Sequence, residues 1–432
     1  MIDDLFEFLR EGVTPYHAAA TAADWLDAAG FTRLEEADYW NLEPGRGYYI
    51  LRNGSAVAAW RVPGHAIGGW RITASHSDAP GWKIKADTVT NDGCRRLSVE
   101  GYGGMNMATW LDRPLTVAGR VLLRTEDGVE TRLVHFDRDL LVIPSLAIHM
   151  QRDVNKGREY NPQIDMQPVW GPADAPTLTD LLCEELGVQP EDILDRDLML
   201  VTRQEPAVIG PKGEWFMAPR IDDLECAATT LLGFIDAAAD TDSACAPLWL
   251  MLDNEEVGSS SRQGAASSFV RDVLDRILAS IPHSAQMEYR ALANSFLLSA
   301  DNGHATHPNF AAKSDPAAPV RLGGGVVLKY NASQKYTTNA LSGGIFRAIC
   351  QKAGVPVQVF TNRADEPGGS TLGNLLSHTV PVPMADIGLA QLAMHSAVET
   401  AALADAEAMV RAVAAFYRVH LRALGDGAYT LE

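Results

Sequence analysis

The chain has few cysteines, no long apolar run and a deficit of positive charge. Its five cysteines are scattered along 432 residues without a C-x-x-C pair, which argues against a disulfide framework or a thiolate metal site. No segment approaches the roughly 18 consecutive apolar residues of a membrane-spanning helix. The acidic start, residues 1–10, also lacks the positive region of a signal peptide. We therefore expect a cytoplasmic protein that does not insert into membranes.

Charge excludes a further class of partner. Asp and Glu number 55 against 36 Lys and Arg, so the formal net charge is −19 at pH 7, and no Lys/Arg-rich stretch offsets it locally. Such an excess repels phosphate backbones and anionic membrane surfaces, so we predict no nucleic-acid partner. The apolar fraction of 47% is ordinary for a globular protein, and a chain of this length has room for two or three domains.

Common catalytic motifs are also missing. The sequence has no G-x-S-x-G, no G-x-x-x-x-G-K-[ST], no H-E-x-x-H and no G-x-G-x-x-G after a predicted strand. This removes the strongest motif evidence for a serine hydrolase, a P-loop NTPase, a single-zinc protease or a dinucleotide enzyme.

The pattern of apolar residues divides the chain. Residues 1–90 and 219–432 alternate amphipathic helices with short apolar strands, which predicts an α/β domain with a mainly parallel central sheet flanked by helices. Residues 91–218 contain short β-like stretches broken by turn residues, which predicts an inserted β-rich domain. A stripe of apolar residues predicts one long helix over 397–421.

Polar residues that directly follow predicted strands, or that begin predicted helices, form a candidate site. In an open α/β sheet, ligands bind at the carboxyl ends of the strands. The residues collected there are His76, Asp78, Asp222, Glu255, Glu256, Asp301 and His395. So many carboxylates cannot all stay ionised a few Å apart without a counter-cation, and a pair of divalent metals would supply one. Nitrogen and carboxylate ligands without thiolate suit Zn²⁺, with Co²⁺ or Mn²⁺ as substitutes.

Each candidate also has a simpler interpretation. A lone His is often a structural hydrogen-bonding residue, and Asp222 alone would be a helix N-cap. Adjacent acids such as Glu255 and Glu256 are usually a solvated surface pair. Here they directly follow the apolar run 247–252, which is typical of a buried strand and favours a site.

The order of these residues resembles that of the aspartyl aminopeptidase family of two-zinc exopeptidases, over residues 5–420. The resemblance rests on segments that include Thr14-Pro-Tyr-His-Ala18, His76-Ser-Asp-Ala-Pro80, Ile148-His-Met-Gln-Arg152, Pro219-Arg-Ile-Asp222, Asp253-Asn-Glu-Glu-Val-Gly-Ser259, Ser299-Ala-Asp301 and Gln391-Leu-Ala-Met-His-Ser396. It implies the two-zinc exopeptidase fold and an aminopeptidase that acts on peptides with a free N-terminus.

The resemblance also assigns roles. Asp222 would bridge two zinc ions; His76 and Asp301 would complete one site, and Glu256 and His395 the other. Glu255 would be the general base that takes a proton from the attacking water and passes it to the leaving amine. Asp78 would accept the second N–H of the His76 imidazole and orient the ring.

Family resemblance further implies a homo-oligomer. The inserted domain would make its contacts, in a tetrahedral shell of twelve subunits, and His149 would reach a neighbouring active site to act in catalysis there. The simpler interpretation of His149 is a structural residue on a β-strand.

Substrate preference is assigned through Lys329. This lysine aligns with one that the family uses near its substrate, so it would bind an acidic N-terminal side chain, Asp or Glu. A surface lysine is the alternative, in an enzyme with the same chemistry that prefers neutral or apolar residues. This chain departs from the family pattern at Asp223, where relatives commonly carry Asn, and the added charge would change metal preference. Two rival functions are a non-catalytic shell or adaptor protein and a two-metal hydrolase of another bond.

Overall fold

The computed structural model describes residues 1–89, 93–238 and 245–432. The chain forms two compact units. The first consists of Met1–Asp78, Pro206–Met394 and Glu399–Glu432, and the second of Ala79–Glu205 and His395–Val398. None of the helices within the described ranges combines the length and the apolar composition of a membrane span.

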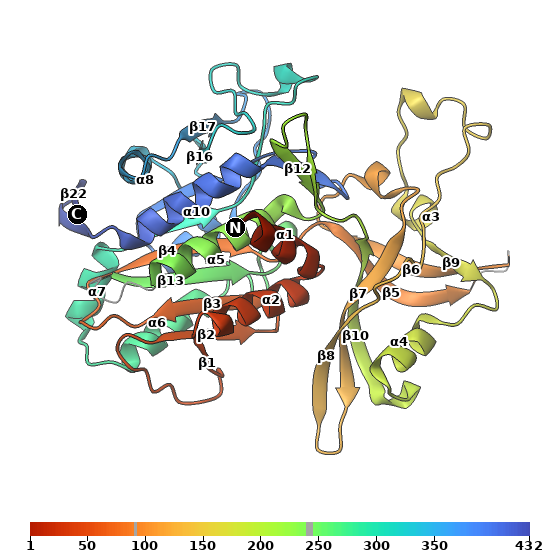
Figure 1. Ribbon diagram of the computed structural model, residues 1–432, viewed down its shortest axis with the longest axis horizontal. Helices are drawn as coiled ribbons and strands as arrows, with labels where there is room; N and C mark the ends of the chain where they lie inside the picture. The colour runs from red at the N-terminus through yellow and green to blue at the C-terminus, as the bar shows by residue number, and fades with distance from the viewer. Residues whose placement is uncertain (90–92, 239–244) are drawn as a thin grey trace. The chain divides into compact units, whose positions relative to one another are not determined.

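A nine-stranded, mainly parallel sheet forms the centre of the first unit (Figure 1). In spatial order its strands are β1 (Thr32–Arg33), β2 (Gly47–Arg52), β3 (Ala56–Arg61), β13 (Cys245–Leu252), β4 (Gly69–His76), β14 (Phe296–Ala300), β18 (Met384–Gly388), β16 (Val326–Tyr330) and β17 (Val357–Thr361). The central neighbours β13, β4, β14 and β18 run parallel. The α/β class and the mainly parallel sheet predicted from sequence are therefore confirmed.

Helices cover both faces of this sheet, so its central strands are buried on both sides. All eight residues of β4 are buried, as expected for a parallel strand covered on both sides. One apolar core joins the sheet to α1 (Ile2–Glu11), α2 (Pro15–Ala28), α5 (Ile221–Ala238), α8 (Ala340–Lys352) and α10 (Leu403–Arg418). A second core joins the other face to α6 (Phe269–Ala279), α7 (Ala285–Ala293) and α9 (Leu372–Thr379).

Two smaller sheets complete the first unit. One has the order β11 (Ala207–Ile209), β12 (Trp215–Ala218), β20 (Glu399–Ala402), β19 (Ala390–Leu392) and β15 (Gly303–His304). The other is the hairpin of β21 (Leu421–Gly425) and β22 (Ala428–Leu431). The predicted helix over 397–421 is therefore too long: α10 begins at Leu403, because the preceding residues pair with β12 and β19 instead.

The second unit is built on a six-stranded antiparallel sheet. Its order is β8 (Val129–His135), β7 (Leu115–Arg124), β10 (Ile193–Thr202), β5 (Gly81–Val89), β6 (Cys94–Tyr102) and β9 (Val169–Pro172). The helices α3 (Pro162–Asp165) and α4 (Leu178–Leu186) belong to the same unit. It has an apolar core of its own, which contains Trp82, Val117 and Leu200. The unit begins before the predicted residue 91 because β5 belongs to its sheet, and it ends before 218 because β12 pairs with β20 of the first unit.

Candidate metal centre

Strand ends bring most of the candidate residues of the first unit to one edge of the large sheet. His76 is the last residue of β4, Asp301 directly follows β14, and Glu255 lies three residues beyond β13. These three strands run parallel and adjacent, so their carboxyl ends meet. Asp222 and Asp223 lie at the start of α5, where their backbone angles depart from helical values before the regular helix begins.

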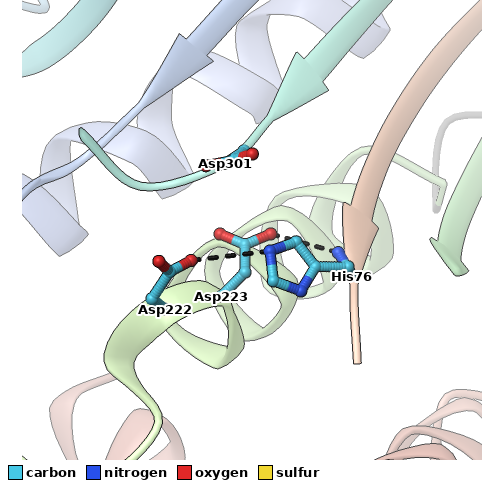
Figure 2. A group of neighbouring side chains, drawn as sticks. All are labelled: His76, Asp222, Asp223 and Asp301. Atoms are coloured by element: carbon cyan, nitrogen blue, oxygen red, sulfur yellow. Dashed lines mark hydrogen bonds and ion pairs between the residues drawn. The ribbon is translucent and has the colours of Figure 1, made fainter. Parts of the chain in front are cut away.

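Four of these side chains form a buried cluster, drawn in Figure 2. One possible ligand atom from each of His76, Asp222, Asp223 and Asp301 lies within 4.8 Å of the others, and all four residues are buried. The imidazole Nε2 of His76 is 3.5 Å from Oδ1 of Asp222. A second group with the same 4.8 Å spacing contains His76, Glu255 and Glu256. His76 thus belongs to both groups.

Asp78 organises this edge in a way that the sequence only partly indicated. The imidazole Nδ1 of His76 is 3.0 Å from the backbone carbonyl oxygen of Asp78 and 3.4 Å from its carboxylate. The two carboxylate oxygens of Asp78 instead accept hydrogen bonds from the backbone N–H groups of Glu255, at 3.0 Å, and Glu256, at 3.1 Å. One side chain therefore holds the turn that carries both glutamates next to the end of β4.

Burial and crowding change the acid–base properties of the cluster. Burial raises the pKa of Glu255 to about 8, and the carboxylates of Asp301 and Glu256 act in the same direction. Burial also raises the pKa of Asp223 well above its usual range and that of Asp301 above its own. For His76, burial lowers the pKa, but Asp223 and the other carboxylates outweigh it and hold the imidazole pKa well above its usual value.

These shifts reflect the crowding of buried carboxylates around one imidazole. Several buried carboxylates share one imidazole, and they ionise together only if positive charge is placed between them. Zn²⁺ accepts this combination of imidazole nitrogen and carboxylate oxygen. The residues of the cluster therefore fit a divalent cation.

Lys329 supplies part of the positive charge. It is 3% exposed, and its Nζ donates to Oδ1 of Asp301 at 3.1 Å and to the carbonyl oxygen of Asn302 at 2.8 Å. Burial lowers the pKa of its ammonium group, but the Asp301 carboxylate outweighs burial and raises it above the usual value. The lysine predicted to bind substrate is thus buried and paired with a candidate metal ligand.

Sequence reasoning missed a polar network behind the cluster. The carboxylate of Asp223 accepts the backbone N–H groups of His76 and Asn302, each at 3.1 Å. The Nδ2 group of Asn302 in turn lies 2.9 Å from Glu225 and 2.8 Å from Gln391. Asn302 follows β14 just as Asp301 does, so the strand-end signal that found Asp301 could have found it as well.

A second anchor holds the start of α5. The backbone N–H of Asp222 donates to Oε2 of Glu399 at 3.0 Å, and Gln391 donates to the other oxygen of Glu399 at 3.3 Å. Gln391 lies in one of the segments that carry the family resemblance, but no sequence signal identifies Glu399, which lies in a short strand of the five-stranded sheet.

Two predicted site residues belong to the second unit. His395 places its ring Nδ1 3.0 Å from the carbonyl oxygen of Gly104, and its own carbonyl accepts the N–H of Asn106 at 2.8 Å. His149 is exposed and lies outside the strands of the sheet, so the alternative position on a β-strand is wrong. The functional roles of both residues remain predictions.

Known proteins resemble this chain over nearly its whole length. The profile of the family described as aminopeptidase I zinc metalloprotease (M18) matches residues 8–417. A probable M18 family aminopeptidase 2 of Clostridium novyi is 38% identical over 414 residues, 93% of this chain and 95% of the relative. The matching chain of the Ape4 and Nbr1 complex is 32% identical with a TM-score of 0.92, over 96% of this chain and 84% of that chain. A chain of the S. cerevisiae mApe1 dodecamer is 25% identical with a TM-score of 0.85, over 96% of both chains.

The family match and the geometry agree. Proteases bind zinc through nitrogen and oxygen ligands, and the cluster around His76 offers both. The fold that carries this cluster is also that of the matched structures. The relatives are aminopeptidases and zinc metalloproteases by their descriptions. The chain belongs to the M18 family of zinc metallo-aminopeptidases.

Proposed function

We propose that this aminopeptidase binds two zinc ions and uses Glu255 as its general base. The carrying observation is the burial of His76, Asp222 and Asp301 within 4.8 Å of one another. These residues would hold one ion, with Asp222 as the bridging carboxylate. The family pattern in the sequence assigns the second ion to Asp222, Glu256 and His395, and Co²⁺ or Mn²⁺ would replace zinc at either position.

Glu255 is suited to move the proton of the reaction. Bound zinc supplies Lewis acidity, which polarises the scissile carbonyl group and makes a nearby water more acidic. Glu255 takes the proton of that water as its oxygen bonds to the carbonyl carbon. It then gives the proton to the amine nitrogen as the peptide bond breaks. The hydrogen bond from its backbone N–H to Asp78 supports this role, because it fixes the turn that carries the side chain.

A preference for Asp or Glu at the substrate N-terminus is the finer part of the proposal. It relies on Lys329, a buried cation within 3.1 Å of Asp301. If the carboxylate of an N-terminal Asp or Glu reaches Lys329, the ammonium group would bind both that carboxylate and Asp301, and the enzyme would favour acidic N-terminal residues. If Lys329 binds Asp301 alone, the enzyme would prefer neutral or apolar N-terminal residues.

Hydrolysis of four p-nitroanilides tests these statements together. We expect aspartyl- and glutamyl-p-nitroanilide to be cleaved faster than the leucyl and lysyl compounds, with zinc or cobalt present and not after chelation. Faster cleavage of the leucyl compound would retain the metal mechanism and reject the acidic preference. If the chelated enzyme kept full activity, the metal assignment would be wrong.

We further propose that the chain forms a homo-oligomer, a tetrahedral dodecamer, through its second unit. The S. cerevisiae relative mApe1 is a dodecamer. Around His149, Leu146 is 40%, Ile148 51% and Met150 75% exposed, and apolar side chains grouped in this way favour a protein contact.

If His149 completes a neighbouring site, His149→Ala lowers kcat while light scattering still reports the intact oligomer. Unchanged kcat in that oligomer would remove the cross-subunit role.

A further inference from the structure

A cleft in the first unit lies next to the metal cluster but is not part of it. Its volume is about 600 Å³, within the range of about 300–1,000 Å³ typical of ligand sites. It opens beyond the carboxyl ends of the parallel strands β16 and β17, whose last residues, Tyr330 and Thr361, pair in register and both line it. This is the end of a parallel strand pair at which ligands usually bind.

The cleft and the cluster share a short stretch of chain. Lys329, which binds Asp301, directly precedes Tyr330. The ring of Tyr336 lies 5.6 Å from Nζ of Lys329, and Tyr336 directly follows Lys335, a residue of the cleft lining. Two pairs of adjacent residues thus connect the surroundings of Asp301 with the cleft lining, and along them a molecule bound at Asp301 would make its extension into the cleft.

The lining offers positive charge and hydrogen-bond donors to such an extension. The ammonium group of Lys335 donates to the carbonyl oxygen of Gly368 at 2.6 Å and has no carboxylate partner within the described part of the chain. Arg363, by contrast, is paired with Asp365, and Glu366 with Lys313. In the same lining, the amide nitrogen of Asn362 is buried, and the Asn362 side chain forms a hydrogen bond with Tyr336.

Both loops around the cleft are fixed to the sheet through one carboxylate. Asp386, in β18, accepts hydrogen bonds from the backbone N–H and hydroxyl of Thr337 in one loop. Its other oxygen accepts the hydroxyl of Thr371, which ends the second loop. A Cβ atom at Gly368 would lie 2.3 Å from Nδ2 of Asn362, so this wall is closely packed. The cleft is therefore formed before ligand binds, which lowers the entropy lost on binding.

We propose that this cleft receives the part of the peptide that follows the scissile bond, and that Lys335 binds a carboxylate there. Its volume exceeds that of a single acidic side chain and suits a short peptide segment. The carboxylate is either the C-terminus of a short peptide or an acidic side chain after the first residue. This inference rests on the aminopeptidase activity proposed above and extends it to the substrate class of short or internally acidic peptides.

Two substrate pairs separate the sources of the carboxylate. Leu-Gly-Gly and its C-terminal amide differ only in the terminal charge, whereas Leu-Asp-amide and Leu-Asn-amide differ only in the side chain. With the zinc-loaded enzyme, we expect the charged member of at least one pair to have about tenfold higher kcat/KM, mostly through KM, as for a charge-assisted bond distant from the reacting atoms. The pair that shows the difference identifies the source.

Substitutions assign the effect to Lys335. K335Q should reduce the ratio within that pair to about one, while the control K352Q keeps it, because Lys352 is exposed and neither it nor its hydrogen-bond partner Leu431 lies in the lining. Equal rates within both pairs of the wild type, or a ratio that survives in K335Q, would overturn the inference. If no peptide is cleaved, the proposed activity fails, and calorimetry tests the inference separately. Gly-Gly must then bind the wild type more tightly than Gly-Gly-amide does, and the two compounds must bind K335Q with equal affinity.

Discussion

Oδ1 of Asp78 accepts a hydrogen bond from the backbone N–H of Glu255 at 3.0 Å. The same side chain binds the N–H of Glu256 through its other oxygen. Two residues beyond the end of β4, one carboxylate therefore determines where the proposed base and a proposed zinc ligand lie. This relationship predicts that Asp78 affects metal binding and turnover without being a ligand itself.

Asp78→Asn should weaken zinc binding by about 10–100-fold, the usual effect of losing a group that orients metal ligands. The asparagine amide presents N–H to a backbone N–H, so one of the two hydrogen bonds is lost. Competition with a chromogenic chelator measures the affinity.

Asp405→Asn is the matched control for Asp78→Asn. Asp405 is also a buried carboxylate that accepts two backbone N–H groups, those of Gly323 at 2.7 Å and Gly325 at 2.6 Å. It is not a member of the metal cluster. Both variants should lose stability, but only Asp78→Asn should lose zinc affinity. An equal loss of zinc in the two variants would show a general effect of stability.

Glu255→Gln should lower kcat by about 10²–10⁴-fold, the usual contribution of a general base. The amide keeps the shape of the side chain but accepts no proton. Zinc content, measured by atomic absorption, should remain that of the wild type, whereas Glu256→Gln should reduce it. A Glu255→Gln enzyme with wild-type kcat would assign the base to another residue.

The stability of the metal-free protein should fall as pH rises from about 4.5 to about 8. The pKa of Glu255 is raised from 4.5 to about 8 in the folded chain, so within this window the folded state holds a proton that the unfolded state has released. Folding that takes up a proton becomes less favourable as pH increases.

Thermal unfolding of chelated wild type and Glu255→Gln measures this effect. The variant should have the higher Tm at pH 8 and lose the advantage near pH 4.5, because glutamine has no charge to bury. Parallel Tm curves for the two proteins across this range would contradict the assignment.

Lys329→Met should destabilise the metal-free protein by about 3–5 kcal/mol, the usual loss when one partner of a buried ion pair is removed. The substitution leaves the carboxylate of Asp301 without its ammonium partner. Bound zinc should restore part of the stability by supplying positive charge in its place. Urea unfolding with and without zinc tests this, with Lys352→Met, at an exposed lysine, as control.

Strand ends explain which part of the site could be predicted from sequence. His76 and Asp301 were found because parallel strands with apolar sequences bring their carboxyl ends to one edge. The anchor from Glu399 to Asp222 was not found, because Glu399 was assigned to a helix and in fact lies in β20, whose pairing partners are distant in the chain. Local apolar periodicity carries no information on such pairings. The fold class depends on local patterns and was predicted correctly.

The order of strands also bears on how the protein is made. β4 ends at His76, yet its two neighbours in the sheet, β13 and β14, begin only at Cys245 and Phe296. While the ribosome synthesises the whole second unit, both edges of this strand, which is buried in the folded protein, lack their final partners. Unpaired strand edges promote aggregation of nascent chains. We therefore expect newly made protein to depend on chaperones until β14 has left the ribosome, and the metal cluster to form only after that point.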